Sequence, residues 1–383
     1  MSKILLALLA VAFVAPALMT LQAQATDPLM ARALRLLKDA PIIDGHNDYP
    51  WEVREKTKKD VDVFDLRKPT PLHTDFARLR AGGVGAQFWS VYVPGDIQKV
   101  SNVSPVTATL EQIDIVHRMI AKYPETLELA LTADDIVRIQ KSGKIASLIG
   151  MEGGHSIDSS VGVLRDMYRL GARYMTLTHN VNLPWADAAA EVPVLNGINQ
   201  LGETILAEMN RLGMLIDLSH VSPDVMQAAL RVSKAPVIFS HSSARGVNDH
   251  VRNVPDAILQ QLPKNGGVVM VTFVPGFISP DVNAYNKKDE AFRKANPAPI
   301  ATVTQVADHI DHIKKIAGID HVGLGGDFDG ITDVIQGLED TSKYPNLIVE
   351  LLRRGYSDDD VKKITSGNIL RALRGAEAAA KHK

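Results

Sequence analysis

Side chains that bind divalent cations stand at the ends of several short apolar segments in this chain of 383 residues. The first segment ends in Asp-Gly-His-Asn-Asp, so that His46 and Asp48 are separated by a single residue. Residues i and i+2 of an extended chain point to the same side, and both side chains can therefore reach one ion. Later segments end in further candidates, namely Glu152, His179, His220, His241 and Asp327.

This set of donors indicates a particular kind of metal. Imidazole and carboxylate groups without any thiolate suit Zn²⁺ or a similar divalent ion. A catalytic zinc takes about three protein ligands and keeps one position open for water, so the set is too large for one ion. The pattern therefore predicts two ions that share a carboxylate and a water-derived nucleophile.

The segments that carry these side chains alternate with longer helical patterns, and this alternation implies parallel βαβ units. Eight strands favour a closed (β/α)₈ TIM-like barrel, in which the metal site lies at the carboxyl ends of the strands. An open doubly wound sheet is the alternative, but no Gly-x-Gly-x-x-Gly fingerprint opens the first turn. The predicted strands are 41–46, 83–91, 145–152, 174–179, 214–220, 236–241, 267–273 and 321–328. The clearest predicted helices are 105–122, 196–212, 222–232 and 301–317.

Composition excludes several classes of protein. The 42 basic and 44 acidic residues give a net charge of −2 without a block of like charge, so we expect no nucleic-acid partner. The chain has no cysteine, which excludes disulfides, thiolate metal sites and thiol nucleophiles.

The N-terminus has the pattern of a targeting segment. Lys3 precedes an apolar run over residues 4–19, and the small-residue site Ala23-Gln24-Ala25 follows. We predict a signal peptide over residues 1–25 and a single domain over residues 26–383. A retained membrane anchor is the alternative, although this run is shorter than the span of about 20 residues that a bilayer requires. Export without any cysteine is typical of the bacterial periplasm, so we expect a secreted, periplasmic protein with no membrane anchor after cleavage.

Other polar features are expected to support the site or to lie away from it. Segments 51–71 and 279–299 are polar and are predicted above the barrel, as a lid or part of a subunit contact. Asp44 and Asp217 precede ligand candidates and are expected to orient loops or imidazoles. Asp329 is the alternative to the acidic residue two positions before it. Four histidines are expected to be structural: His155, His309, His312 and His321.

Taken in order, the motifs resemble those of the membrane (renal) dipeptidase family, metallopeptidases of the amidohydrolase-like barrels. The matching blocks are DGHND (44–48), EGGH (152–155), LTHN…PWAD (177–187), DLSH (217–220), FSHSSAR (239–245), RNVPD (252–256) and GGDFDG (325–330). The resemblance covers about residues 41–370. It implies that His46 and Asp48 bind one zinc, that His220 and His241 bind the second, and that Glu152 bridges the two.

The resemblance also implies roles beyond the metals. Asp327 matches the carboxylate that acts on the bridging water as general acid/base, and His179 and Arg252 match substrate-binding residues. An alternative for His179 is a core histidine near Trp185, and an alternative for Arg252 is a surface ion pair with Asp256. Mammalian relatives carry disulfides and a lipid anchor. This chain has no cysteine for a disulfide, and residues 378–383 show no hydrophobic tail that would signal a lipid anchor, so neither feature is expected here. A non-covalent homodimer is what the family implies.

The function implied is zinc-dependent hydrolysis of dipeptides by a hydroxide that bridges two Zn²⁺ ions per chain. One alternative is another binuclear amidohydrolase that acts on N-acyl amino acids or β-lactams. Many such barrels bridge their metals with a modified lysine, whereas no predicted strand end here carries lysine. A binding protein without catalysis is a further alternative, which would not require a full set of ligands.

Overall fold

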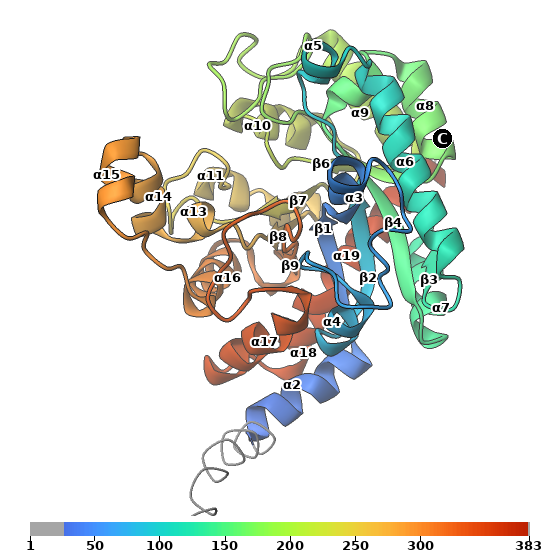
Figure 1. Cartoon of the computed structure of the whole chain (residues 1–383). Helices are drawn as coiled ribbons and strands as arrows, with labels where there is room; N and C mark the ends of the chain where they lie inside the picture. The colour runs from blue at the N-terminus through green and yellow to red at the C-terminus, as the bar shows by residue number, and fades with distance from the viewer. Residues whose placement is uncertain (1–26, 382–383) are drawn as a thin grey trace, which may run out of the picture.

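The structure, a computed structural model, describes residues 27–381. Its centre is a ring of eight parallel strands, in the order β2-β1-β9-β8-β7-β6-β5-β4, which closes where β2 pairs with β4 (Figure 1). The strands are β1 (Ile42–Asn47), β2 (Val84–Ser90), β4 (Ile145–Glu152), β5 (Ala172–Thr176), β6 (Leu215–Asp217), β7 (Ile238–Ser242), β8 (Val268–Val271) and β9 (Val322–Leu324). The predicted (β/α)₈ barrel is therefore confirmed.

One short strand was not predicted. β3 (Leu127–Leu129) pairs with the first half of β4, on the edge that β5 occupies further along. Its three residues are too few to show an alternating pattern, and Glu128 among them weakens the apolar signal.

Several predicted strands run past their observed ends. The segments 174–179, 214–220 and 321–328 leave the barrel at Thr176, Asp217 and Leu324, respectively. The residues beyond these ends form loops that carry buried polar side chains, among them Thr178, Ser219 and His220. The polar tips therefore belong to the turns above the barrel, where active sites of such barrels are built.

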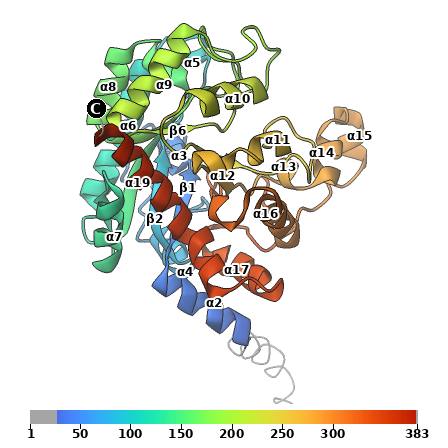
Figure 2. The same ribbon diagram turned by 180° about the vertical axis from the view of Figure 1, so that it is seen from behind.

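Helices surround the ring on all sides (Figures 1 and 2). They are α2 (Pro28–Asp39), α3 (Tyr49–Thr57), α4 (Phe76–Ala81), α5 (Ile97–Ser101), α6 (Pro105–Lys122), α7 (Ala133–Lys141), α8 (Val161–Arg169), α9 (Gln200–Leu212), α10 (Pro223–Val232), α11 (Asp256–Leu259), α12 (Leu262–Asn265), α13 (Pro275–Ile278), α14 (Pro280–Asn286), α15 (Glu290–Ala295), α16 (Val303–Ala317), α17 (Tyr344–Arg353), α18 (Asp358–Lys362) and α19 (Asn368–Lys381). Within residues 27–381, none combines the length and apolar character needed to cross a bilayer.

The four predicted helices are present, and local capping explains their starts. The hydroxyls of Ser104 and Ser222 accept hydrogen bonds from backbone N–H groups of α6 and α10, and proline follows each cap. α9 begins at Gln200 instead of residue 196, because the side chain of Asn199 accepts from the first turn. Residues 196–199 form a loop, in which Asn196 has a left-handed backbone with φ of 53°.

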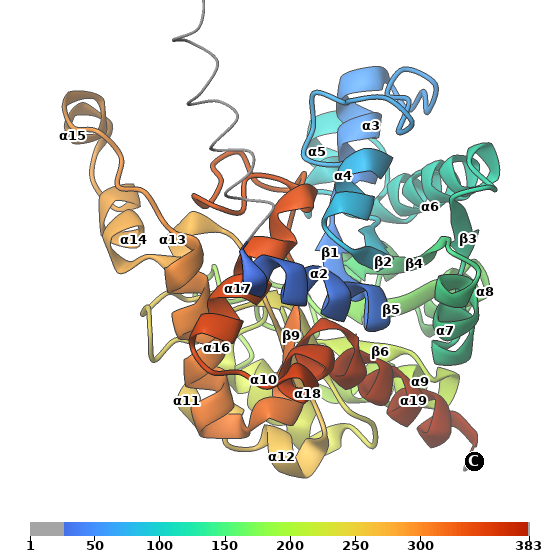
Figure 3. The same ribbon diagram turned by 90° about the horizontal axis from the view of Figure 1, so that it is seen from below.

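The two faces of the barrel differ. α2 leads into the start of β1 and packs with α17 and α18 on the face shown in Figure 3. α14 and α15 project from the side of the molecule, and no residue of α15 is buried. The carboxyl ends of the strands form the opposite face, and there the buried polar side chains gather.

Candidate metal centre

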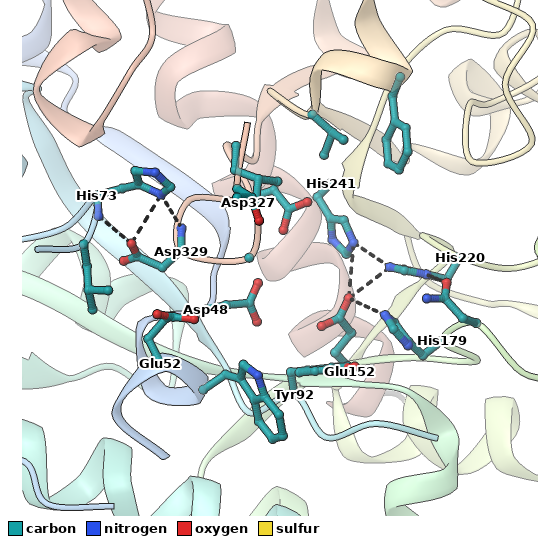
Figure 4. Close-up of a pocket in the computed structure, with 18 of the residues that line it drawn as sticks. Asp48, Glu52, His73, Tyr92, Glu152, His179, His220, His241, Asp327 and Asp329 are labelled. Atoms are coloured by element: carbon teal, nitrogen blue, oxygen red, sulfur yellow. Dashed lines mark hydrogen bonds and ion pairs between the residues drawn. The ribbon is translucent and has the colours of Figure 1, made fainter. Parts of the chain in front are cut away.

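The five predicted metal ligands converge at the carboxyl ends of the strands, with Glu152 at the end of β4 in the middle. Figure 4 shows four of them, namely Asp48, Glu152, His220 and His241. One of its oxygens, Oε2, lies 3.4 Å from His46 Nε2. The other, Oε1, lies 3.0 Å from His220 Nε2 and 3.4 Å from His241 Nε2. The Oε2 side of Glu152 is here called the first side, and the Oε1 side the second side. On the first side, His46 Nε2 is also 3.2 Å from Asp48 Oδ2.

These donors fit two cations that share a carboxylate. Ligand atoms within 4.8 Å of one another form three overlapping groups: His46–Asp48–Glu152, Glu152–His220–His241 and His46–His241–Asp327. Nε2 of His46 and Oδ1 of Asp48 are buried and have no hydrogen-bond partner among the described residues. Burial raises the pKa of Glu152, but the surrounding imidazoles outweigh it and hold that pKa well below its usual value.

Hydrogen bonds fix two of the imidazoles with Nε2 toward the centre. Nδ1 of His220 lies 3.1 Å from the amide oxygen of Asn180, which can only accept. Nδ1 of His241 lies 2.8 Å from Ser240 Oγ, whose own proton goes to Asp217 at 2.6 Å. Each Nδ1 therefore carries the proton, and the two Nε2 atoms, 2.9 Å apart, turn their lone pairs toward each other, an arrangement that a cation between them would stabilise. Burial lowers the pKa of both rings well below the usual value, which keeps them neutral.

The imidazole of His46 is oriented in the same way, with Nδ1 in a hydrogen bond and Nε2 toward the centre. The hydroxyl of Tyr174 donates to the carbonyl of Gly45 and lies 2.8 Å from Nδ1 of His46. Its oxygen thus accepts from Nδ1, and Nε2 of His46 faces the carboxylates. Burial lowers the pKa of His46, but Tyr174 and the charges of Asp48 and Glu152 outweigh it and hold the pKa well above its usual value. The carboxylates that raise this pKa would equally favour a metal cation bound at Nε2 of His46.

Asp327 lies beside the first side of the centre, with its Oδ1 3.9 Å from His46 Nε2. The turn after β9 is joined to the end of β1 by two hydrogen bonds, from Asp327 N to His46 O and from Asp48 N to Phe328 O. At Gly330, any side chain would collide with the Asp48 carboxylate, so glycine permits this close approach. Burial raises the pKa of Asp327 well above its usual value, and the nearby carboxylates add to this effect.

A cavity of about 560 Å³ opens above these side chains. Arg252 lines it and is only 5% exposed, and its Nε and Nη1 have no partner among residues 27–381. The guanidinium lies 5.1 Å from the ring centre of Phe277. Burial lowers the pKa of Arg252 to about 10, which still leaves it charged at neutral pH. A buried cation without a partner, aimed into a cavity, is suited to an anionic group of a ligand.

His179 also lines the cavity, with its Nε2 3.8 Å from Glu152 Oε1. Burial lowers the pKa of His179 to about 4, so the ring is neutral at pH 7. Because His179 faces the cavity, the alternative of a core histidine is wrong. The alternative for Arg252 is also wrong, because Asp256 pairs instead with His312 at 2.8 Å.

The supporting residues lie largely where the sequence indicated. Asp44 accepts hydrogen bonds from the backbone N–H groups of His46 and Gly326, and Asp217 holds Ser240 as described above. His155 lies 2.8 Å from the carbonyl of Val93 and makes no part of the ligand groups. The remaining structural histidines, His309, His312 and His321, bond to backbone or to a carboxylate outside the cavity.

Other side chains at the site were not predicted. Tyr174 lies on a strand rather than at its tip, and the alternation of β5 was a signal for its inward direction. Asn180 directly follows His179, and Ser240 directly precedes His241. His73 carries no motif, although it lines the cavity and bonds to Asp329.

The two polar segments have different relations to the cavity. Part of segment 51–71 lines its rim, including Trp51, Glu52 and Lys56. No residue of segment 279–299 lines it. A lid or subunit contact remains a prediction for both.

Comparisons with known proteins agree with this geometry. The family model described as "Membrane dipeptidase (Peptidase family M19)" matches residues 30–383. Dipeptidase verJ of Clonostachys rogersoniana is 43% identical over 359 residues, which cover 92% of this chain and 88% of the relative. Dipeptidase 3 of Mus musculus is 45% identical over 358 residues, covering 92% and 68%.

Solved structures show the same fold. The probable dipeptidase PvdM from Pseudomonas aeruginosa has a TM-score of 0.79 at 23% identity, covering 92% of this chain and 99% of its own. A metallo peptidase from Rhodobacter sphaeroides, liganded with a phosphinate mimic of the dipeptide L-Ala-D-Ala, has a TM-score of 0.76 at 23% identity, covering 88% and 99%.

A closed barrel with imidazoles and carboxylates gathered at its carboxyl face defines the class of barrel metallohydrolases. Within that class, the chain belongs to the membrane dipeptidase family, peptidase family M19. It is accordingly an enzyme of the metallo-dipeptidase type.

Proposed function

We propose that the protein hydrolyses dipeptides with two Zn²⁺ ions per chain. His46 and Asp48 would hold one ion, His220 and His241 the other, and Glu152 both. The observation that carries this proposal is the shared carboxylate: each of its oxygens faces imidazole nitrogens whose lone pairs are free. When bound, such ions supply Lewis acidity and lower the pKa of a bound water toward about 7.

The protein's own residues supply the proton transfer. Asp327 lies next to the centre and would take a proton from the attacking water on a carboxylate oxygen. It would then return that proton to the amide nitrogen as the C–N bond breaks, so that the free amine leaves. The raised pKa of Asp327 suits a group that must both accept and donate a proton.

Two residues are proposed to bind the substrate directly. His179 is neutral at pH 7 and would donate a hydrogen bond to the carbonyl oxygen as that oxygen becomes negative. One such donor is worth about 3–4 kcal/mol in comparable sites. Arg252 would bind the C-terminal carboxylate, for which its planar fork provides two parallel hydrogen bonds. The carboxylates around Asp48 would take the free amine, so that both ends of a short peptide are fixed.

Metal removal and one substitution test this function. Exhaustive chelation should abolish dipeptide hydrolysis, and added zinc should restore it. Arg252→Lys should raise KM for a free dipeptide about tenfold or more, since an ammonium cannot replace a bidentate contact. It should have much less effect on the same dipeptide amidated at its C-terminus.

A neighbouring arginine provides the control. Arg245 lies in the same loop but bonds to the carbonyls of Asn253 and Val251, outside the cavity. Arg245→Lys should change KM for the free dipeptide and for the amidated dipeptide by the same factor. Full activity after verified metal removal would contradict the proposal. Faster turnover of N-acyl amino acids or β-lactams than of dipeptides would instead favour the alternative amidohydrolase, whose substrates also offer Arg252 a carboxylate.

The location and assembly of the protein are further proposals. We infer export through a signal peptide over residues 1–25, which leaves residues 26–383 as a periplasmic, non-covalent homodimer without a membrane anchor. The support is the sequence pattern and the family. Mass determination of the exported protein and light scattering test both statements, and an intact N-terminus or a monomer would contradict them.

A further inference from the structure

The turn that carries Asp327 has an unusual backbone. Asp327 and Asp329 both adopt left-handed conformations, with φ of 63° and 67°. Such conformations are uncommon for residues other than glycine, although aspartate adopts them more readily than most, and surrounding contacts hold them in place. The hydrogen bonds to β1 hold the start of this turn, and its far end requires a separate support.

That support comes from a segment distant in the sequence, residues 71–75, here named the brace. The backbone N–H of His73 donates to Asp329 Oδ1 at 2.6 Å, and the backbone N–H of Asp329 donates to His73 Nδ1 at 3.0 Å. The two residues thus form a reciprocal pair (Figure 4). The next residue, Thr74, accepts a hydrogen bond at 2.9 Å from Asn47, which lies between the ligand candidates His46 and Asp48.

Side chains on the outer side of the brace hold it in place through hydrogen bonds and an ion pair. Arg78 of α4 donates to the carbonyls of Thr70 and Leu72 and forms an ion pair with Asp75 at 2.6 Å. The carbonyl of His73 accepts from Thr341 at 3.1 Å. The brace is therefore fixed to the helical shell on one side and to the β1 and β9 turns on the other.

We propose that His73 is a positioning residue, which holds the Asp327 turn in its left-handed conformation through the reciprocal pair with Asp329. The inference rests on the proposed role of Asp327 as general acid/base. In this view the polar excursion before α4 serves to set the distance between the proton-transfer group and the metal ligands.

The test compares two substitutions of one residue. His73→Leu removes the Nδ1 acceptor at similar size, and we expect kcat to fall by about 10- to 100-fold, since small misplacements of a reacting group have effects of this order. KM and the zinc content should be unchanged. His73→Asn should restore most of the lost rate, because the Asn amide oxygen can accept where Nδ1 does.

A matched control separates this effect from general destabilisation. His312 is exposed to nearly the same degree, 21% against 23% for His73, and it also pairs with an aspartate, outside the cavity. His312→Leu should leave kcat unchanged. A loss of kcat in His312→Leu equal to that in His73→Leu would overturn the inference.

The double variant His73→Leu/Asp327→Asn gives the most direct answer. If His73 acts through Asp327, the double variant should be no slower than Asp327→Asn alone, because no acid/base group remains to be misplaced. If the losses of kcat in the two single variants multiply in the double variant, the inference is overturned. It is also overturned if the KM of His73→Leu changes with the first residue of the dipeptide, because His73 would then contact the substrate directly. If kcat falls in Asp327→Asn but not in His73→Leu, only the inference about His73 is refuted. If kcat is unchanged in Asp327→Asn, the proposed proton transfer is refuted as well.

Discussion

The two sides of Glu152 differ in chemistry, although they share one carboxylate. On the first side, His46 is the single imidazole, and Asp48 and Asp327 add carboxylates. On the second side, His220 and His241 provide two neutral imidazoles, and within the described part of the chain their ligand group contains no carboxylate besides Glu152.

This difference indicates a division of tasks. The carboxylate-rich first side compensates positive charge and holds the proposed proton acceptor, so it suits harder cations as well as zinc. The imidazole-rich second side suits zinc and similar transition metals, and it faces His179, the proposed donor to the substrate carbonyl. Substitutions that act on one side, or on both, test whether the two sides are separate in this way.

The largest effect is expected where the two sides meet. Glu152→Gln replaces a shared negative charge with a neutral amide, which cannot neutralise two cations. We expect fewer than two zinc ions per chain and a loss of turnover of about 10³-fold or more, given that such ions contribute several kcal/mol. Metal analysis after dialysis measures the first effect. Two ions bound with unchanged affinity would show that Glu152 is not the bridge.

A smaller effect is expected from the proton acceptor alone. Asp327→Asn keeps the shape of the side chain but removes its ability to take a proton near neutrality. We expect kcat to fall by about 10²–10⁴-fold, with little change in KM or in bound zinc. Steady-state kinetics and metal analysis decide the matter. Loss of one zinc would place Asp327 among the ligands, and unchanged kcat would transfer the role to Asp329.

The smallest effects are expected from the residues behind the imidazoles, and they separate the two sides. Tyr174→Phe removes the acceptor of His46, whereas Ser240→Ala removes that of His241. Each should weaken metal binding about 10- to 100-fold, but only on its own side. Chelator competition measures the affinities, and absorption spectra of cobalt-loaded protein distinguish oxygen-rich from nitrogen-rich coordination. Equal weakening of both ions by either variant would mean that the two sides are a single unit.

The convergence of the ligand candidates followed from the sequence because each stands at or just beyond a strand end. In a closed parallel barrel all such ends meet at one face, so strand prediction alone brought Glu152, His220 and His241 together. The predicted starts of α6 and α10 agree with the structure to within one residue, because a capping serine followed by proline stands at each. These features depend on short stretches of chain, which a sequence shows directly.

The brace could not be predicted in this way. His73 and Asp329 are 256 residues apart, and neither belongs to a periodic pattern that would indicate their pairing. The left-handed backbone at Asp327 could not be predicted either, because an aspartate in a sequence does not indicate this conformation as a glycine does. The structure was also needed to show that Nε and Nη1 of Arg252 have no hydrogen-bond partner within residues 27–381, since the sequence places Asp256 nearby.

The position of α2 bears on how the enzyme can be attached to a surface. α2 leads into β1 at the face opposite the cavity, and it packs there against α17 and α18. A linker joined ahead of α2 would therefore leave the molecule on the far side from the substrate entrance. An immobilised or fused form built at this end should keep an open path for peptides, whereas attachment through the turns after the strands would obstruct it.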